Sequence, residues 1–234
     1  LSVDPSISPD LELRFGGSSI TARRVEFAAL EDTHEALFDR GWTDGLPVVP
    51  PSEERVTEML KGTSRSPEDI VALIPPDLAP CSVEKVAINA VMAGCKPEYL
   101  PVVLAGVEAV CTQTFNMHGL LATTMPHAPV LIVNGPITEQ IGMNSGNNAL
   151  GQGNRANSTI GRAVQLVIRN VGGGRPGEVD RATFGSPGKV GFCFAEREKD
   201  SPWSPISTMY GFPEGTNTVL AFPGEAPRNL IDQL

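Results

Sequence analysis

The segment from Pro126 to Gly174 constrains the fold of this chain more than any other. Residues 128–133 form an apolar run rich in β-branched residues, and Asn134-Gly135-Pro136 ends it as a turn ends a buried strand. A polar stretch dense in glycine and asparagine follows from Gly142 to Thr159. Helical periodicity then resumes and stops at three glycines, with the apolar positions Ile160, Val164, Val167, Ile168 and Val171. The pattern predicts a strand, a long loop and a central helix whose N-cap is Asn157 or Ser158.

A glycine-rich loop that leads into a helix presents backbone N–H groups and the positive end of the helix dipole to a ligand. We therefore expect a binding site for a small polar or anionic substrate here, with one cation and several carboxamides: Asn144, Asn147, Asn148, Asn154, Arg155, Asn157 and Ser158. The alternative is a solvated surface loop whose glycines only make turns. The loop lacks GxxxxGK[ST] and does not fit GxGxxG in register, so a nucleotide site is not predicted.

Composition excludes several classes of protein. The chain has 234 residues, of which 41% are hydrophobic and 19% charged, and it carries a formal net charge of −9. Its lysines and arginines are scattered, so no basic stripe favours nucleic acid as a partner. The apolar runs are far shorter than the ~20 residues that a membrane helix needs, so a membrane protein is not expected. The four cysteines have no CxxC spacing, which predicts reduced thiols and a cytoplasmic location.

The order of patterns predicts an α/β fold, with α+β as an alternative because helices cluster early and strands late. Helices are expected over 21–40, 52–60, 82–93 and 97–111, packed on a small mixed sheet with strands at 128–133, 189–195 and 218–222. We expect an extended N-terminal arm over residues 1–21 and a single domain over 22–234. The absence of a starting methionine and a last helix cut short after Pro227 indicate a trimmed or processed chain.

The helix that begins after Ser82 is apolar nearly all round, so its polar side chains need partners. Lys85 and Asn89 lie four residues apart on one side of it, and we expect them to support a nearby site. Gly94-Cys95 ends this helix, and the next helix begins at Pro97, which places Cys95 at the corner of an αα-hairpin.

The candidate catalytic residues are His118 and Cys95. A histidine before a glycine at the start of the central strand suits a general base or metal ligand, and Cys95 suits a nucleophile if its thiol is activated. Metal ligation by His118, Glu84 or Glu196 is a weaker alternative, because no two of these have a known ligand spacing such as HxxxH. A buried structural role is the more usual outcome for cysteines, and no cofactor is identified.

Three strings, at residues 41–51, 83–95 and 144–173, resemble a bacterial protein family of poorly defined function. Members of this family occur beside, or fused to, small proteins with a UGSC or CGSC thiol/selenol motif. That motif is absent here, since Gly16-Gly17-Ser18-Ser19 contains neither cysteine nor selenocysteine, so the chain resembles the companion component. The resemblance implies thiol-linked redox or lyase chemistry together with a partner chain, and it carries over no catalytic residues.

These observations support three functional hypotheses. The first is an enzyme subunit that acts on a small polar or anionic substrate by thiol-linked redox or lyase chemistry. The second is a non-catalytic binding or assembly subunit for a thiol-bearing partner chain or for a second copy of itself. The third is a metal-dependent hydrolase or lyase.

Overall fold

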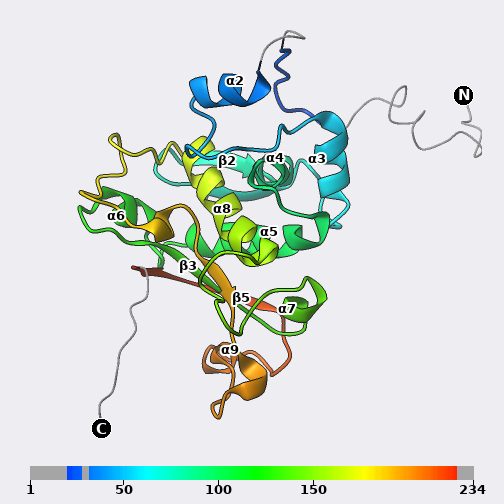
Figure 1. Ribbon diagram of the computed structural model, residues 1–234, viewed down its shortest axis with the longest axis vertical. Helices are drawn as coiled ribbons and strands as arrows, with labels where there is room; N and C mark the ends of the chain where they lie inside the picture. Colours follow the sequence, from blue (N-terminus) through cyan, green and yellow to red (C-terminus); the bar gives the residue numbers. More distant parts are fainter. Residues whose placement is uncertain (1–19, 28–31, 226–234) are drawn as a thin grey trace, which may run out of the picture.

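The structure is a computed structural model that describes residues 20–27 and 32–225. Its helices pack on small mixed sheets of two and three strands, which confirms the expected α/β or α+β class (Figure 1). The predicted N-terminal arm lies largely outside the described residues, and the truncated helix after Pro227 lies wholly outside them.

The three-stranded sheet has the order β4-β3-β5, with β3 (Ala128–Asn134) in the centre. This strand pairs in parallel with β4 (Cys193–Ala195) and antiparallel with β5 (Thr218–Gly224). Six of the seven residues of β3 are buried, as its continuous apolar run predicts. Helix α8 (Arg155–Asn170) connects the two parallel strands, so β3, α8 and β4 form a βαβ unit.

The remaining helices lie around this βαβ unit and toward both ends of the molecule (Figure 1). They are α2 (Thr33–Asp39), α3 (Glu53–Leu60), α4 (Val83–Ala93), α5 (Leu100–Val110) with a preceding 3₁₀ turn η1 (Pro97–Tyr99), α6 (Met117–Ala122), α7 (Ile137–Gln140) and α9 (Ile206–Met209). Two further 3₁₀ turns are η2 (Pro187–Lys189) and η3 (Glu198–Asp200), and β1 (Ile70–Ile74) pairs antiparallel with β2 (Ala79–Ser82).

Local sequence signals predicted several helix ends correctly. Ser52 caps α3 by accepting a hydrogen bond from the Arg55 N–H, and Ser82 caps α4 by accepting one from the Lys85 N–H. Gly94 ends α4 in the left-handed conformation, at φ 88°, where glycine is the favoured residue. The αα-hairpin with Cys95 at its corner is therefore as predicted.

Three predicted boundaries were wrong. In the described part of the predicted helix over 21–40 only α2 is helical, and residues 20–27 are irregular, with the N–H groups of Thr21 and Ala22 donating to the Glu84 side chain of α4. The N-cap of α8 is Asn154, whose side chain accepts from the Asn157 N–H, so the helix begins three residues early. The predicted strand over 189–195 is only β4, because 187–189 form η2.

Helix α8 lies very close to the segment that leads into β4. A Cβ atom added to Gly191 would lie 2.4 Å from the Arg162 backbone nitrogen, and one added to Gly161 would lie 2.7 Å from the Phe192 nitrogen. Both positions therefore require glycine. The opposite side of α8 packs on α4 and α5, so the helix runs through the hydrophobic core, where Ile160, Leu166 and Val167 are fully buried.

Candidate ligand-binding site

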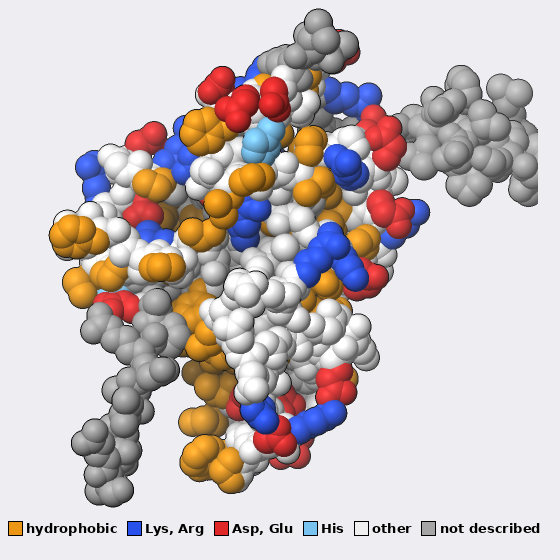
Figure 2. Space-filling view, in the orientation of Figure 1, with side chains coloured by type: hydrophobic (Ala, Val, Ile, Leu, Met, Phe, Trp, Pro, Cys, Tyr) orange, Lys and Arg blue, Asp and Glu red, His pale blue; other side chains and the backbone are white. Residues whose placement is uncertain are grey.

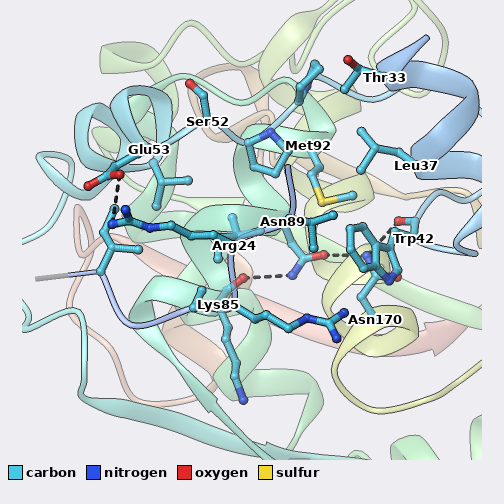
Figure 3. A pocket seen from close by; sticks show the side chains of 18 of the residues that line it. Arg24, Thr33, Leu37, Trp42, Ser52, Glu53, Lys85, Asn89, Met92 and Asn170 are labelled. Atoms are coloured by element: carbon cyan, nitrogen blue, oxygen red, sulfur yellow. Dashed lines mark hydrogen bonds and ion pairs between the residues drawn. The ribbon is translucent and has the colours of Figure 1, made fainter. Parts of the chain in front are cut away.

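A cavity of about 700 Å³ lies between the segment 20–27, helices α2, α3 and α4, and the C-terminal end of α8. Most of its wall is apolar (Figure 3). The apolar side chains include Val25, Phe27, Leu37, Trp42, Val56, Ile88, Met92 and Val171, together with Pro50 and Pro51. The polar and charged side chains include Arg23, Arg24, Glu26, Ser52, Glu53, Lys85, Asn89 and Asn170.

A chain of amide hydrogen bonds orders one wall of this cavity. The Asn170 Nδ2 atom donates to the Asn89 Oδ1 atom at 2.8 Å and to the Trp42 carbonyl oxygen at 3.0 Å. Asn89 is only 4% exposed, and its own Nδ2 donates to the Lys85 carbonyl oxygen. Figure 3 shows Asn89, Asn170 and Trp42 together at one side of the cavity. These bonds join α4, the end of α8 and the segment after α2, so the wall is rigid before any ligand arrives.

Positive charge exceeds negative charge around the cavity. Three cationic side chains, Arg23, Arg24 and Lys85, face two carboxylates, Glu26 and Glu53. One cation is neutralised, because Arg24 forms an ion pair with Glu53 at 3.0 Å, as Figure 3 shows. Lys85 donates from Nζ only to the Pro80 carbonyl oxygen, at 2.8 Å, so its charge has no acidic partner among the described residues.

Glu84 holds the segment that supplies the arginines. Its side chain is 2% exposed, and its carboxylate accepts from the Thr21 N–H at 3.1 Å, the Thr21 hydroxyl at 2.9 Å and the Ala22 N–H at 2.9 Å. Three hydrogen bonds of this kind occupy the carboxylate and compensate for its burial. Through these hydrogen bonds Glu84 positions the backbone of Thr21 and Ala22, in the segment that lines the cavity.

The predicted substrate loop lies between β3 and α8 and has Arg155 as its one charged residue, and Figure 2 shows a pale area of uncharged groups in the middle of that face. Asn157 organises it. This buried side chain accepts from the Asn144 N–H at 3.1 Å and donates to the carbonyl oxygens of Asn144 and Ala149 at 2.8 and 3.0 Å. The amide of Asn157 thus has no N–H donor left for a ligand.

The other predicted loop residues divide into three groups. In the first group, the side-chain Nδ2 atoms donate to backbone carbonyl oxygens of the loop. Asn144 donates to Asn147, Asn148 to Gln152 and Asn154 to Gly142. The Arg155 Nε atom donates to the Gly94 carbonyl oxygen at 2.9 Å, which ties the start of α8 to the corner beside Cys95. The side chains of Asn147 and Ser158 are exposed. None of the seven residues lines the cavity, whereas Lys85 and Asn89 do.

Burial favours the protonated form of the candidate thiol, that of Cys95. Cys95 is 7% exposed, and burial raises the pKa of its thiol to about 12, although a hydrogen bond with the Thr159 side chain and the charges of Arg155 and Arg162 act the other way. Burial likewise raises the pKa of Cys81 and Cys111 to about 12, and it raises that of Cys193 further, with a contribution from nearby Cys95. All four are free thiols in this structure.

The structure does not gather the remaining candidates. His118 is exposed on α6, and Glu196, at the end of β4, accepts from the Ile206 N–H at 3.0 Å. In residues 20–27 and 32–225, no hydrogen bond or ion pair joins His118, Cys95, Glu84 or Glu196 to one another, and no three His, Cys, Asp or Glu side chains form a group that could hold a metal ion.

Sequence reasoning missed most of the cavity. Its lining comes from segments spread over residues 20–171, and only Lys85 and Asn89 were singled out as polar groups in need of partners. The available signal was the proline-rich string after Gly41, which was used above only for the family resemblance. Trp42, Pro50 and Pro51 of that string all face the cavity.

None of the described helices is long and apolar enough to cross a membrane. Comparison of the chain with protein-family models, with curated proteins and with solved structures gave no match. The bacterial family suggested by the three strings therefore stays a prediction.

The loop geometry predicts that Asn157 is structural. Replacing Asn157 by Ala removes three hydrogen bonds and leaves two carbonyl oxygens unpaired, so we expect the free energy of unfolding to fall by about 2–4 kcal/mol. The matched control is Asn147→Ala, whose exposed side chain forms no hydrogen bond in the described structure, and which should change it by less than about 0.5 kcal/mol. Urea unfolding measures both, and equal effects would contradict the structural role.

The raised pKa of Cys95 predicts slow alkylation. An ordinary thiol is about one-tenth thiolate at pH 7.5, whereas a thiol with a pKa of about 12 is less than about one ten-thousandth thiolate. The labelling rate of folded Cys95 with iodoacetamide should therefore rise about tenfold per pH unit from pH 7 to 10 without a plateau. Peptide mass spectrometry measures it, with the urea-unfolded chain as the control. Fast labelling with a plateau near neutral pH would show an activated thiolate.

Proposed function

We propose that this chain is the ligand-binding subunit of an enzyme, and that the cavity between 20–27, α2, α3, α4 and α8 holds a small molecule with an apolar body and an anionic end. The observation that carries this proposal is the combination, in one cavity, of apolar walls with Lys85 and an ordered pair of amides. Small-molecule sites characteristically have mostly apolar walls and a few fixed polar groups.

The size of the cavity supports this assignment. Its volume of about 700 Å³ falls inside the range of roughly 300–1,000 Å³ found for small-molecule sites. Trp42 and Met92 offer a flat and an adaptable apolar surface for a ring or an alkyl chain. The amide pair of Asn89 and Asn170 is fixed in orientation by its own hydrogen bonds, which favours one binding pose over others.

The charge of the lining selects the class of ligand. The protein as a whole has a formal net charge of −9, so a local excess of cations stands out against it. Lys85 and Arg23 are the cations of the lining without an acidic partner in the described residues, and they suit a carboxylate, sulfonate or phosphate. A neutral ligand of the same shape would leave the charges of Lys85 and Arg23 without an anionic partner.

The reaction itself is proposed from the resemblance. Thiol-linked redox or lyase chemistry on a small anionic substrate would need a thiolate, and the buried thiols of this chain do not supply one in this state. We therefore place the reacting thiol on a partner chain. Catalysis by His118 and Cys95 stays a prediction that rests on the sequence alone.

An anionic and a neutral fluorescent probe test the cavity. We expect 8-anilinonaphthalene-1-sulfonate to bind and to quench Trp42, and Ile88→Trp, which fills the cavity, to abolish that binding. Lys85→Gln should weaken the sulfonate probe by up to about fivefold, or roughly 1 kcal/mol, and leave the neutral probe N-phenyl-1-naphthylamine unchanged.

Leu73→Trp is the control for added bulk, because Leu73 is 54% exposed on β1 and lies outside the cavity. Fluorescence titration gives the affinities of all variants. Equal binding of both probes by Ile88→Trp and the unmodified chain would refute the cavity as the ligand site. Loss of the neutral probe in Lys85→Gln would refute the charge argument.

A second candidate is a companion subunit without chemistry, and exposed apolar side chains favour it. Trp203 is 78% exposed, Met209 82% and Tyr210 63%, all within or beside α9 at the end of the molecule where Figure 2 shows apolar side chains. Apolar groups of this size that gather on a surface are typical of protein interfaces. A thiol-bearing chain, or a second copy of this chain, would cover them.

Native mass spectrometry of the protein purified from its own host separates the two candidates. We expect a small anionic ligand on this chain together with a stoichiometric second chain, the outcome that places ligand binding here and the thiol elsewhere. A lone chain with full activity would rule out the companion function and also the placement of the reacting thiol on a partner chain. A complex whose ligand stays on the other chain would rule out the ligand-binding function. The reduced cysteines lead us to propose a cytoplasmic location for the complex.

A further inference from the structure

Two carboxylates and one amide meet at the carboxyl ends of the parallel strands. Asn134 is the last residue of β3, Glu196 follows β4 directly, and Glu198 begins η3. Because β3 and β4 are parallel and paired, these side chains lie at one edge of the sheet. In βαβ units this edge, outside the carboxyl ends of the strands, is where ligands bind. The cluster is at the other end of the molecule from the cavity (Figure 1).

The amide of Asn134 lies between the two carboxylates. Its Nδ2 atom is 2.5 Å from the Glu196 Oε2 atom and 2.7 Å from the Glu198 Oε1 atom. Backbone N–H groups hold both acids in place, since Ile206 donates to Glu196 at 3.0 Å and Gly135 donates to Glu198 at 2.8 Å. The geometry of the cluster is therefore set by the fold.

The two negative charges lack a counter-ion. Neither Glu196 nor Glu198 forms an ion pair in the part of the chain that the structure describes, although both are partly buried. The basic residues adjacent to them in sequence form ion pairs with other acidic residues: Arg197 pairs with Asp200, and Lys199 pairs with Glu139. Two carboxylates around one neutral amide repel each other, and a cation between them removes that repulsion.

Two polar atoms beside the cluster lack a hydrogen-bond partner. Asn134 is 1% exposed, yet its Oδ1 atom has no hydrogen-bond partner, and the buried hydroxyl of Thr218 has none either. Asn134 and Thr218 are directly opposite in the β3–β5 pair, so their side chains share a face. In the structure the Asn134 Nδ2 atom donates to both carboxylates, and turning the amide head by 180° would exchange the two atoms and place Oδ1 there instead. Three oxygens that lie together in this way favour a cation among them.

We propose that Glu196, Glu198 and the Asn134 carbonyl oxygen bind one divalent cation of the Mg²⁺ or Mn²⁺ type, with water in the remaining positions. Mg²⁺ characteristically takes one or two protein carboxylates and keeps several waters, so the site needs no third acid. An all-oxygen set excludes a structural zinc site of the cysteine and histidine kind. The site is separate from the cavity, so its failure leaves the proposed function untouched.

Binding of Mn²⁺ to the full chain, followed by electron paramagnetic resonance and calorimetry, tests the proposal. We expect one Mn²⁺ per chain, displaced by Mg²⁺, and a loss of affinity of more than about tenfold in Glu196→Gln and in Glu198→Gln. Glu214→Gln is the matched control, because Glu214 is exposed and outside the cluster, and it should bind as the unmodified chain does.

Asn134→Asp keeps the proposal testable if a glutamine variant fails to fold. A third carboxylate in the cluster should lower the unfolding temperature without metal, and Mn²⁺ should restore it and bind more tightly than to the unmodified chain. Two results would overturn the proposal: no Mn²⁺ bound at millimolar concentration, as expected if water bridges Asn134 and Thr218, or binding that both glutamine variants retain.

Discussion

The close contact between Gly161 of α8 and Gly191 before β4 is the constraint on which the rest of the structure depends. With no Cβ on either side, the backbone of the helix lies directly against the chain that leads into the sheet. The other sides of α8 are then free to pack on α4 and α5. The position of α8 therefore sets the positions of both its ends. The helix begins beside the predicted substrate loop, and its last residue, Asn170, lies in the wall of the cavity.

Local chemistry made the main elements predictable. Ser52 and Ser82 each precede a helix and have few rivals as caps, and the apolar run before Asn134 could only be a buried strand. The start of α8 was mispredicted for a physical reason. Asn154 and Asn157 have the same capping ability, and the choice was made by the loop, which uses the Asn157 amide to bind its own backbone.

The candidate site was less predictable because its contacts are long-range. Lys85 and Asn89 could be recognised as polar groups on an apolar helix, but the partner of Asn89 is Asn170, 81 residues away and one asparagine among many. The same limit applies at the sheet edge. Glu196 was considered as a ligand with His118 and Glu84, whereas its neighbours are Asn134 and Glu198, which only the pairing of β3 with β4 brings together.

Glu84 shows how a single residue type permits opposite interpretations. A carboxylate such as that of Glu84 suits a metal ligand, yet here it accepts three hydrogen bonds from Thr21 and Ala22. Burying a charge is costly unless such bonds compensate for it, so the segment 20–27 and Glu84 are ordered together. That segment would otherwise continue as the helix its periodicity predicts. The hydrogen bonds to Glu84 instead place Arg23 and Arg24 in the lining of the cavity, so a negative side chain in the core adds cations to the site beside Lys85.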